Sequence, residues 1–279
     1  MCIKLAYDMK HFKRKCDCET GGSMIHKSWF HKVEVKDFNI DYEIYIPKNI
    51  KKLIINNYNG DIDLPPISSH INVQLQKGHL TAPALKLSRE SRVYLSKSTA
   101  NFGLLYANEA SINMEHCPKI EIDSLLHTKI NSRFSFIDIK YVNYSYLVTN
   151  NDSLMISQLD NIVLKGQFSN LTFENIEKTA DIHMSSSGSL NIKKVAADFE
   201  EITIDGHYSH CQMQLPKTNY EIFTELKNTN FTYPTGLFDA NWTLKAKYDK
   251  LTDSKIIGPK NAEGPKIDIK CTNCDLELN

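Results

Sequence analysis

From about Leu53 onward the chain repeats a unit of roughly 17 to 21 residues, and this repeat limits the possible folds more than any other feature. Each unit contains a run of alternating apolar residues, a polar turn and a second apolar run, as in INVQLQKGHLTAPAL and KINSRFSFIDI. Alternation places the apolar residues of a run on one side of a β-strand. A single unit cannot bury that side alone, so neighbouring units must stack. The repeat predicts an all-β protein, a single-stranded, β-helix-like β-solenoid of roughly ten coils.

The turns recur at similar steps along the chain. They are Asn59-Gly60, Lys77-Gly78, Cys117-Pro118, Asn151-Asp152, Ser169-Asn170 and Ser187-Gly188. Asn, Ser, Asp and Gly suit such corners because they adopt positive φ or bond the backbone through their side chains. Alternation then predicts Ile71, Val73 and Leu75 inside, with Gln74 and Lys165 outside. An antiparallel β-sandwich gives similar strand spacing and remains the alternative fold.

Charge and hydropathy exclude several function classes. The 279 residues include 33 Lys+Arg and 33 Asp+Glu, so no surplus of cations favours nucleic acid or an anionic membrane surface. No stretch approaches the roughly 20 apolar residues of a transmembrane helix. The first 22 residues do not show the pattern of a signal peptide, which leaves either a cytoplasmic product or a start further upstream.

The chain divides by composition into an N-terminal segment and a repeat domain. Residues 1–40 are polar and lack the repeat, so we expect an irregular segment or cap there. Residues 41–279 form the predicted solenoid domain. Within it, residues 234–265 are rich in Gly, Pro and Lys, which predicts a loop-rich excursion. Trp242 in this excursion is expected to pack against the core.

Three segments carry a family resemblance. DYEIYIPKNIKKLIINNYNGDIDL (41–64) contains a strand ending in proline, followed by an I-x-N-x-x-G-D-I coil. TNYEIFTELKNTNFTYP (218–234) and GPKIDIKCTNCDLEL (264–278) are similar to closing coils with a T-x-N-G-D-I turn. These segments resemble the adhesin-like β-solenoid family of exported bacterial proteins (auto-transporter adhesin head type), a domain family of unknown function. Cys274 stands where that family has glycine, and Asn228-Thr229-Asn230 also lacks it.

The resemblance implies a location and a general role. It implies an extracytoplasmic protein of the cell envelope, in the periplasm or at the cell surface. It also implies a non-enzymatic, adhesin-like structural or interaction module whose ligand is unknown. The adhesin label is an analogy of fold and assigns no biochemical activity.

Cysteine and histidine suggest two candidate sites, and for both we favour a structural role. A tetrahedral zinc site uses such residues, but their spacing in the N-terminal segment matches no compact zinc finger. The residues concerned are His11, Cys16, Cys18, His26 and His31. Cys271 and Cys274 form a C-x-x-C, which is redox active in a strand-to-helix context. Here the pair occupies a predicted turn, with a strained turn disulfide as the lesser alternative, and its redox state stays open.

An enzyme is the first alternative function, because parallel β-helices include polysaccharide lyases and hydrolases, which need paired acids or an acid with arginine and calcium. Asp61 and Asp63 share a strand face, but Asp61 belongs to a turn where its carboxylate is expected to bond backbone N–H groups. The other candidates lie in separate coils: Asp160, Asp181, Asp205, Arg89, Arg92 and Arg133. His207, His210 and Cys211 are close in sequence, but His210 neighbours Cys211 rather than facing it. We predict no catalytic residue, cofactor or metal.

Recognition and self-assembly are the remaining alternatives. Tyr141, Tyr144 and Tyr146 crowd one stretch, and aromatic clusters on a β face dock sugars or proteins. They are equally compatible with packing between coils. The expected partner is an envelope protein or a surface glycan. A self-assembling β-helical scaffold needs matching bare ends, which the divergent termini disfavour, and the oligomeric state stays open.

Overall fold

The structure is a computed structural model that describes residues 44, 50–218, 220–234, 243–249, 251–257 and 264–279. The solenoid unit begins at Lys51 and contains 23 β-strands, with no helix among the described residues. The expected N-terminal segment, residues 1–40, lies outside the described residues. So do its candidate zinc ligands (His11, Cys16, Cys18, His26 and His31) and Trp242.

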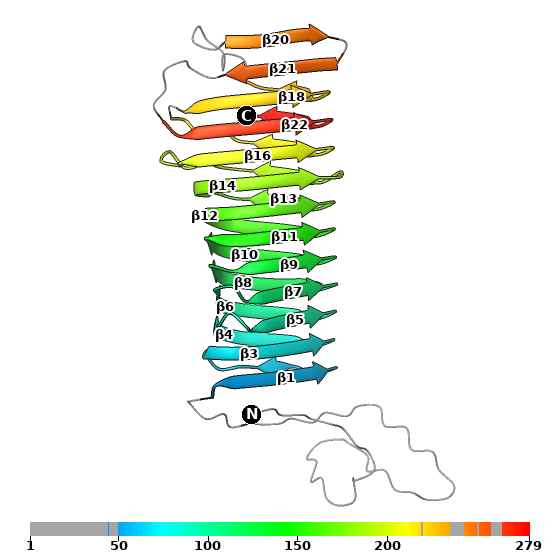
Figure 1. The fold of residues 1–279 in the computed structure, drawn as a ribbon, viewed down its shortest axis with the longest axis vertical. Coiled ribbons are helices and arrows are strands. Elements are labelled where there is room, and N and C mark those ends of the chain that lie inside the picture. The colour runs from blue at the N-terminus through cyan, green and yellow to red at the C-terminus, as the bar shows by residue number, and fades with distance from the viewer. Residues whose placement is uncertain (1–43, 45–49, 219, 235–242, 250, 258–263) are drawn as a thin grey trace, which may run out of the picture. The chain divides into compact units, whose positions relative to one another are not determined.

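The strands stack in parallel ladders that run along the unit (Figure 1). Ladder 1 contains β1 (Lys52–Tyr58), β3 (Ile67–Gln76), β5 (Arg92–Ser96), β7 (Ser111–Glu115), β9 (Lys129–Arg133), β11 (Ser145–Asn150), the end of β12 (Ser153–Gln167), β14 (Ile176–Ser185), β16 (Glu201–His207), β22 (Lys266–Thr272) and β18 (Glu221–Lys227). Ladder 2 contains β2 (Ile62–Asp63), β4 (His79–Leu87), β6 (Thr99–Ala107), β8 (Lys119–Leu126), β10 (Phe136–Asn143), the start of β12, β13 (Asn170–Phe173), β15 (Ser189–Ile192), β17 (His210–Met213), β23 (Asp275–Leu278) and β19 (Asn230–Thr232). A third, shorter ladder runs from the start of β3 through the ends of β4, β6, β8 and β10 to the middle of β12.

These ladders make a β-solenoid of about nine turns, which confirms the predicted fold. Equivalent residues of successive coils pair in parallel, for example Leu75 with Leu95 and Leu95 with Met114. Parallel pairing excludes the antiparallel sandwich. The residues predicted to face inward, Ile71, Val73 and Leu75, are at most 2% exposed. They are buried because alternate residues of the strands face a continuous apolar core.

A corner separates ladder 1 from ladder 2 in each coil, and a residue with left-handed backbone conformation makes the turn. The corner residues are Asn59, Lys77, Lys97, His116, Phe134, Asn151, Phe168, Ser186 with Ser187, Tyr208, Asn273 and Asn228. Their amides donate to carbonyls of the next coil, as Phe134 N does to Asn150 O at 3.0 Å. The predicted turns are therefore present, but two corner residues, His116 and Phe168, precede the expected Cys117 and Ser169.

In the middle coils, a small buried residue follows the corner residue and links successive coils through hydrogen bonds. Cys117 N donates to Ser135 Oγ at 3.0 Å, Ser135 N to Asp152 Oδ1 at 2.7 Å, and Asp152 N to Ser169 Oγ at 3.2 Å. Asp152 also accepts a hydrogen bond from Asn150 N at 3.0 Å. Burial of its carboxyl raises the pKa of Asp152 to about 6, and the backbone donors offset part of this effect.

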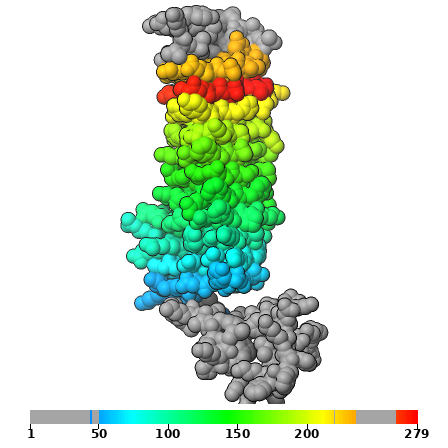
Figure 2. Space-filling model, turned by 90° about the vertical axis from the view of Figure 1, so that its right-hand side faces the viewer, coloured from blue at the N-terminus to red at the C-terminus, as the bar shows by residue number. Residues whose placement is uncertain are grey.

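The last coil of the sequence does not lie at the end of the stack. β22 pairs with β16 on one side and with β18 on the other, and β23 lies likewise between β17 and β19. In Figure 2 the red C-terminal coil forms a band between yellow and orange coils that precede it in sequence. Beyond β18, the antiparallel strands β21 (Leu251–Ile257) and β20 (Thr243–Asp249) cover the edge of ladder 1. The expected excursion at 234–265 therefore contains a β-hairpin.

Candidate functional site

The outer surface of ladder 1 carries two adjacent rows of side chains, which we call the polar strip. The strand register fixes both rows. The first row is Tyr94, Asn113, Asn131, Val148, Lys165, His183 and Asp205, and the second is Ser96, Glu115, Arg133, Asn150, Gln167, Ser185 and His207. Because each coil contributes one residue to each row, the strip runs along the stack and not around it.

One end of the strip is organised around a carboxylate. Tyr94 donates through its hydroxyl to Glu115 Oε2 at 2.9 Å, and Arg133 Nη2 donates to Glu115 Oε1 at 2.6 Å. The hydrogen bond from Arg133 lowers the pKa of Glu115, and that from Tyr94 adds to the effect. Burial raises the pKa of Tyr94, as does its bond to Glu115. The three groups are therefore a neutral donor, an anion and a cation held in fixed positions at neutral pH.

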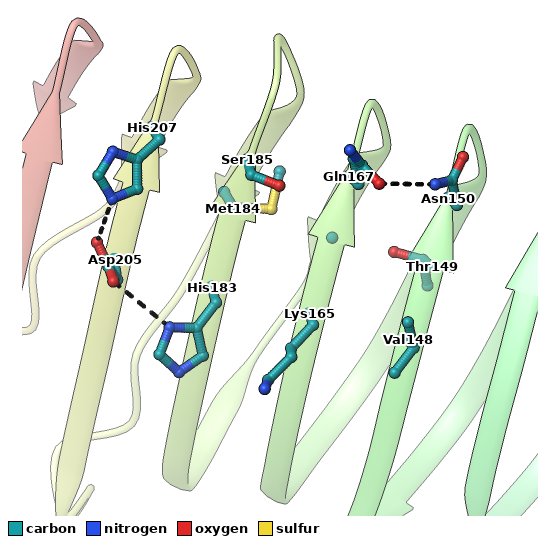
Figure 3. Close-up of a pocket in the computed structure, with 11 residues that line it drawn as sticks. Val148, Thr149, Asn150, Lys165, Gln167, His183, Met184, Ser185, Asp205 and His207 are labelled. Atoms are coloured by element: carbon teal, nitrogen blue, oxygen red, sulfur yellow. Dashed lines mark hydrogen bonds and ion pairs between the residues drawn. The ribbon is translucent and has the colours of Figure 1, made fainter.

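The other end of the strip holds His183, Asp205 and His207 (Figure 3). Asp205 lies between two rings, with Oδ2 at 3.6 Å from His183 Nδ1 and Oδ1 at 3.3 Å from His207 Nε2. Asp181 Oδ1 lies 3.2 Å from the other ring nitrogen of His183. Between the two ends, Asn150 Nδ2 donates to Gln167 Oε1 at 2.8 Å.

The strip contains two open hollows. One of about 270 Å³ is lined by residues that include Lys165, Gln167, His183 and His207. A second of about 410 Å³ lies over the Tyr94, Glu115 and Arg133 group. Sites that enclose a small molecule have roughly 300 to 1,000 Å³ and bury most of the ligand. Two open hollows on one strip fit an elongated ligand lying on the surface better than an enclosed one.

A row of exposed aromatic rings, which we call the corner ridge, borders the polar strip. It consists of Phe134, Phe168 and Tyr208, whose exposed fractions are 49%, 48% and 63%. Each directly follows a residue of the second row and has a φ of 51° to 53°. The ring of His116 stacks on Phe134 at 4.8 Å between centroids. Corner residues of alternate coils supply the three rings, so their spacing along the stack is roughly 10 Å.

The residues of the corner ridge have an unfavourable backbone conformation. Left-handed conformation costs most non-glycine residues about 1 to 2 kcal/mol, and Asn tolerates it better than a bulky residue does. Asn fills the same corner at positions 59, 151, 228 and 273. The coils therefore accept Asn here, and packing of the core does not require the exposed rings. Such local strain is typical of functional positions.

The structure separates most of the acids considered as catalytic candidates. Asp61 Oδ1 accepts a hydrogen bond from His79 N at 2.8 Å, as expected for a turn carboxylate. Asp160 accepts a 2.6 Å bond from Tyr141 that helps raise the pKa of this tyrosine to about 12. Asp181 and Asp205 lie in separate coils as expected, and both lie within ion-pair distance of His183. His210 is exposed on β17 while its neighbour Cys211 is buried.

The remaining candidates divide as follows. Arg133 belongs to the polar strip, whereas Arg89 pairs with Glu109 at 2.7 Å and Arg92 begins β5. Asp63 is exposed on β2. The three tyrosines do not form one patch: Tyr141 bonds Asp160 in the third ladder, Tyr144 stacks on His127 at a different corner, and Tyr146 lies under Lys129 in ladder 1.

Cys271 and Cys274 flank the corner residue Asn273, as the turn prediction requires, and both are buried with free thiols. Sequence reasoning did not connect them with Cys211, which lies on the neighbouring coil and hydrogen-bonds Cys271. The corner ridge was missed for a different reason, since Phe134, Phe168 and Tyr208 look like ordinary alternating apolar residues.

No group of three or more His, Cys, Asp or Glu among the described residues is arranged to hold a metal ion. The same part of the chain contains no helix long and apolar enough to cross a membrane. Comparisons with family models, curated proteins and solved structures find no match. The fold and its surface thus define the class of the protein, a parallel β-solenoid with a polar strip and an aromatic ridge, and the adhesin-like resemblance stays a prediction.

Proposed function

We propose that the protein is a non-enzymatic interaction module that binds an extended glycan along the polar strip and the corner ridge. The corner ridge carries this proposal, because exposed aromatic rings occupy strained positions that Asn fills in other coils. Aromatic faces pack against the apolar faces of sugar rings, while carboxylate, amide and guanidinium groups bond hydroxyls. The strip supplies such groups in a line beside the rings.

The geometry favours a polymer over a small sugar. The three ridge rings recur at every second coil, and the strip continues across seven coils from Tyr94 to Asp205. A chain with a repeating unit places the same group opposite each ring in turn, so weak contacts add up. An envelope protein is the alternative partner.

Retention on polysaccharides tests the proposal. Purified protein is passed over insoluble cellulose, xylan, chitin and peptidoglycan and titrated with soluble polygalacturonate, and each is repeated with a Tyr144→Asn variant. Tyr144 is also exposed with a left-handed conformation, but at a different corner. We expect saturable binding of at least one polysaccharide and equal binding by the variant. Absence of binding to all five polysaccharides, or loss of binding in Tyr144→Asn, would contradict the proposal.

We further propose that the protein acts outside the cytoplasm, as its resemblance to exported proteins implies. Fractionation of the native cells with an antibody against the solenoid tests this location. Recovery in the periplasm or on the surface is the expected result. Recovery in the cytoplasm alone would overturn it.

A further inference from the structure

Three buried thiols meet where the inserted C-terminal coil lies against its neighbour. Cys271 and Cys274 come from the β22–β23 coil and Cys211 from β17, and each is at most 4% exposed. Cys271 hydrogen-bonds both other thiols. Ser209 Oγ lies 3.6 Å from Cys211 Sγ and 3.5 Å from Cys274 Sγ. The cluster therefore joins two coils that are far apart in sequence.

A glycine makes room for the cluster. Gly206 on β16 is paired with Cys271 on β22. A Cβ atom at Gly206 would lie 3.1 Å from Cys271 Sγ and 3.3 Å from Cys274 Sγ. The sulfur atoms thus occupy the space that a larger residue on the adjacent strand would fill, and this brings them within reach of Cys211.

We propose that the cluster is a disulfide-exchange site in which Cys211 and Cys271 form a bond that fixes the inserted C-terminal coil in place. This bond would join β17 to β22 and close the long segment between them. That segment includes β18, β19 and the hairpin β20–β21. β18 must not pair with β16 directly, because β22 lies between these two strands. Disulfides that close long segments constrain the unfolded chain most strongly.

The chemistry is ordinary thiol–disulfide exchange with a low-molecular-weight disulfide, RSSR. Cys274 thiolate attacks RSSR and releases RS⁻, and Cys271 thiolate then attacks the mixed disulfide at Cys274 Sγ and releases the second RS⁻. Cys211 thiolate finally attacks Cys271 Sγ, forms Cys211–Cys271 and frees Cys274 thiolate. Two thiols lose two protons and two electrons in total, and RSSR is reduced to two RSH.

The hydrogen bonds within the cluster favour a product that contains Cys271. The bond from Cys271 and the bonds involving Ser209 lower the pKa of Cys274 to about 6, against the effect of burial. The Cys271 pKa is raised instead. In exchange reactions the thiol of lower pKa is the better leaving group. The pKa of Cys211 is lowered too by its bond to Cys271. Cys271 is therefore the thiol retained in the disulfide, and the link to Cys211 on the neighbouring coil is the one that holds two coils together.

Burial sets the conditions of the test, since thiols inside the folded coil react slowly with an external oxidant. The full-length reduced protein is unfolded in denaturant, refolded with glutathione and glutathione disulfide, quenched with acid, alkylated and mapped by mass spectrometry. We expect a Cys211–Cys271 cross-link in most molecules and alkylated Cys274. A Cys271–Cys274 cross-link, or free thiols at both 211 and 271, would overturn the proposal.

Single variants separate exchange from folding. Cys274→Ser is expected to slow formation of the cross-link at least tenfold without abolishing it, and Cys271→Ser to remove it. Cys117→Ser is the matched control, because Cys117 occupies the corresponding buried corner site and bonds the carbonyls of Leu95 and Glu115. It should leave the cross-link unchanged. The oxidised wild type should unfold at a Tm on the order of 5 °C higher than the reduced protein, and an equal or lower Tm would contradict a stabilising bond.

Discussion

Ser135 N donates a 2.7 Å hydrogen bond to Oδ1 of Asp152, a buried carboxyl at a corner position where adjacent coils carry Ser135 and Ser169. The Asp152 pKa is raised from 3.8 to about 6, so between these values the folded protein binds more protons than the unfolded chain. Stability from this group is present below about pH 4 and is lost as pH rises to 6 and above. The difference between the two pKa values corresponds to at most about 3 kcal/mol of unfolding free energy.

Asp152→Ser restores the residue type of the neighbouring coils and removes the titrating group. We expect the variant to be more stable than wild type at pH 7 and to lose the stability change between pH 4 and 6. Chemical denaturation at a series of pH values measures both. An unchanged pH profile in the variant would show that Asp152 is not its source.

A second prediction concerns the close approach of two coils at Gly78. A Cβ atom there would lie 2.0 Å from the carbonyl oxygen of Gly60, a backbone atom that cannot move aside. Gly78→Ala should therefore lower the unfolding free energy by at least about 2 kcal/mol. Gly60→Ala is the control, since its Cβ would first meet the Asn57 amide at 3.1 Å. Equal effects of both changes on Tm would refute this account of the coil contact.

A third prediction separates binding from folding in the polar strip. Arg133→Gln removes the cation beside Glu115 while the Tyr94 hydrogen bond remains. Arg133 is exposed and Glu115 only partly covered, so the thermal midpoint should change little. Affinity for the polysaccharide should fall about tenfold, because a hydrogen bond from a charged group is lost. Lys119→Gln, which breaks an exposed Lys119–Glu121 pair on ladder 2, should leave the affinity unchanged. Loss of affinity in the control alone would place the binding face elsewhere.

A fourth prediction follows from strain in the corner ridge. Phe168→Asn replaces a bulky left-handed residue with one that tolerates this conformation, as Asn151 does one coil away. The unfolding free energy should stay equal or rise by up to about 1 kcal/mol. Denaturant titration of the single variant checks this, and a clear loss of stability would mean that the ring supports the fold.

The sequence predicts the coil pattern well because alternation and turn chemistry are local. Ile71, Val73 and Leu75 face the core as expected, and Asn59 and Asn151 form corners. Insertion of the last coil between β16 and β18 is not local. Both neighbouring strands have the same alternating pattern. In the strand register, Lys266 lies opposite Glu201 on one side and opposite Glu221 on the other. Nothing in the residues specifies which coil is adjacent.

The candidate site was less accessible to sequence reasoning. Asp205 meets His183 only because strands from successive coils are in register. Phe168 and Tyr208 follow polar residues and read as continued alternation, whereas the left-handed corner turns them outward. The signal that could have found them is positional, since Asn recurs at the equivalent corners of other coils.

Glycan affinity of the triple variant Phe134→Asn, Phe168→Asn, Tyr208→Asn tests the central claim most directly. Its Tm is measured beside its dissociation constant for the polysaccharide that wild type retains. We predict a Tm within a few degrees of wild type and at least a hundredfold loss of affinity, since stacking contacts at three rings are removed. Wild-type affinity in a folded triple variant would contradict a glycan-binding role for the corner ridge.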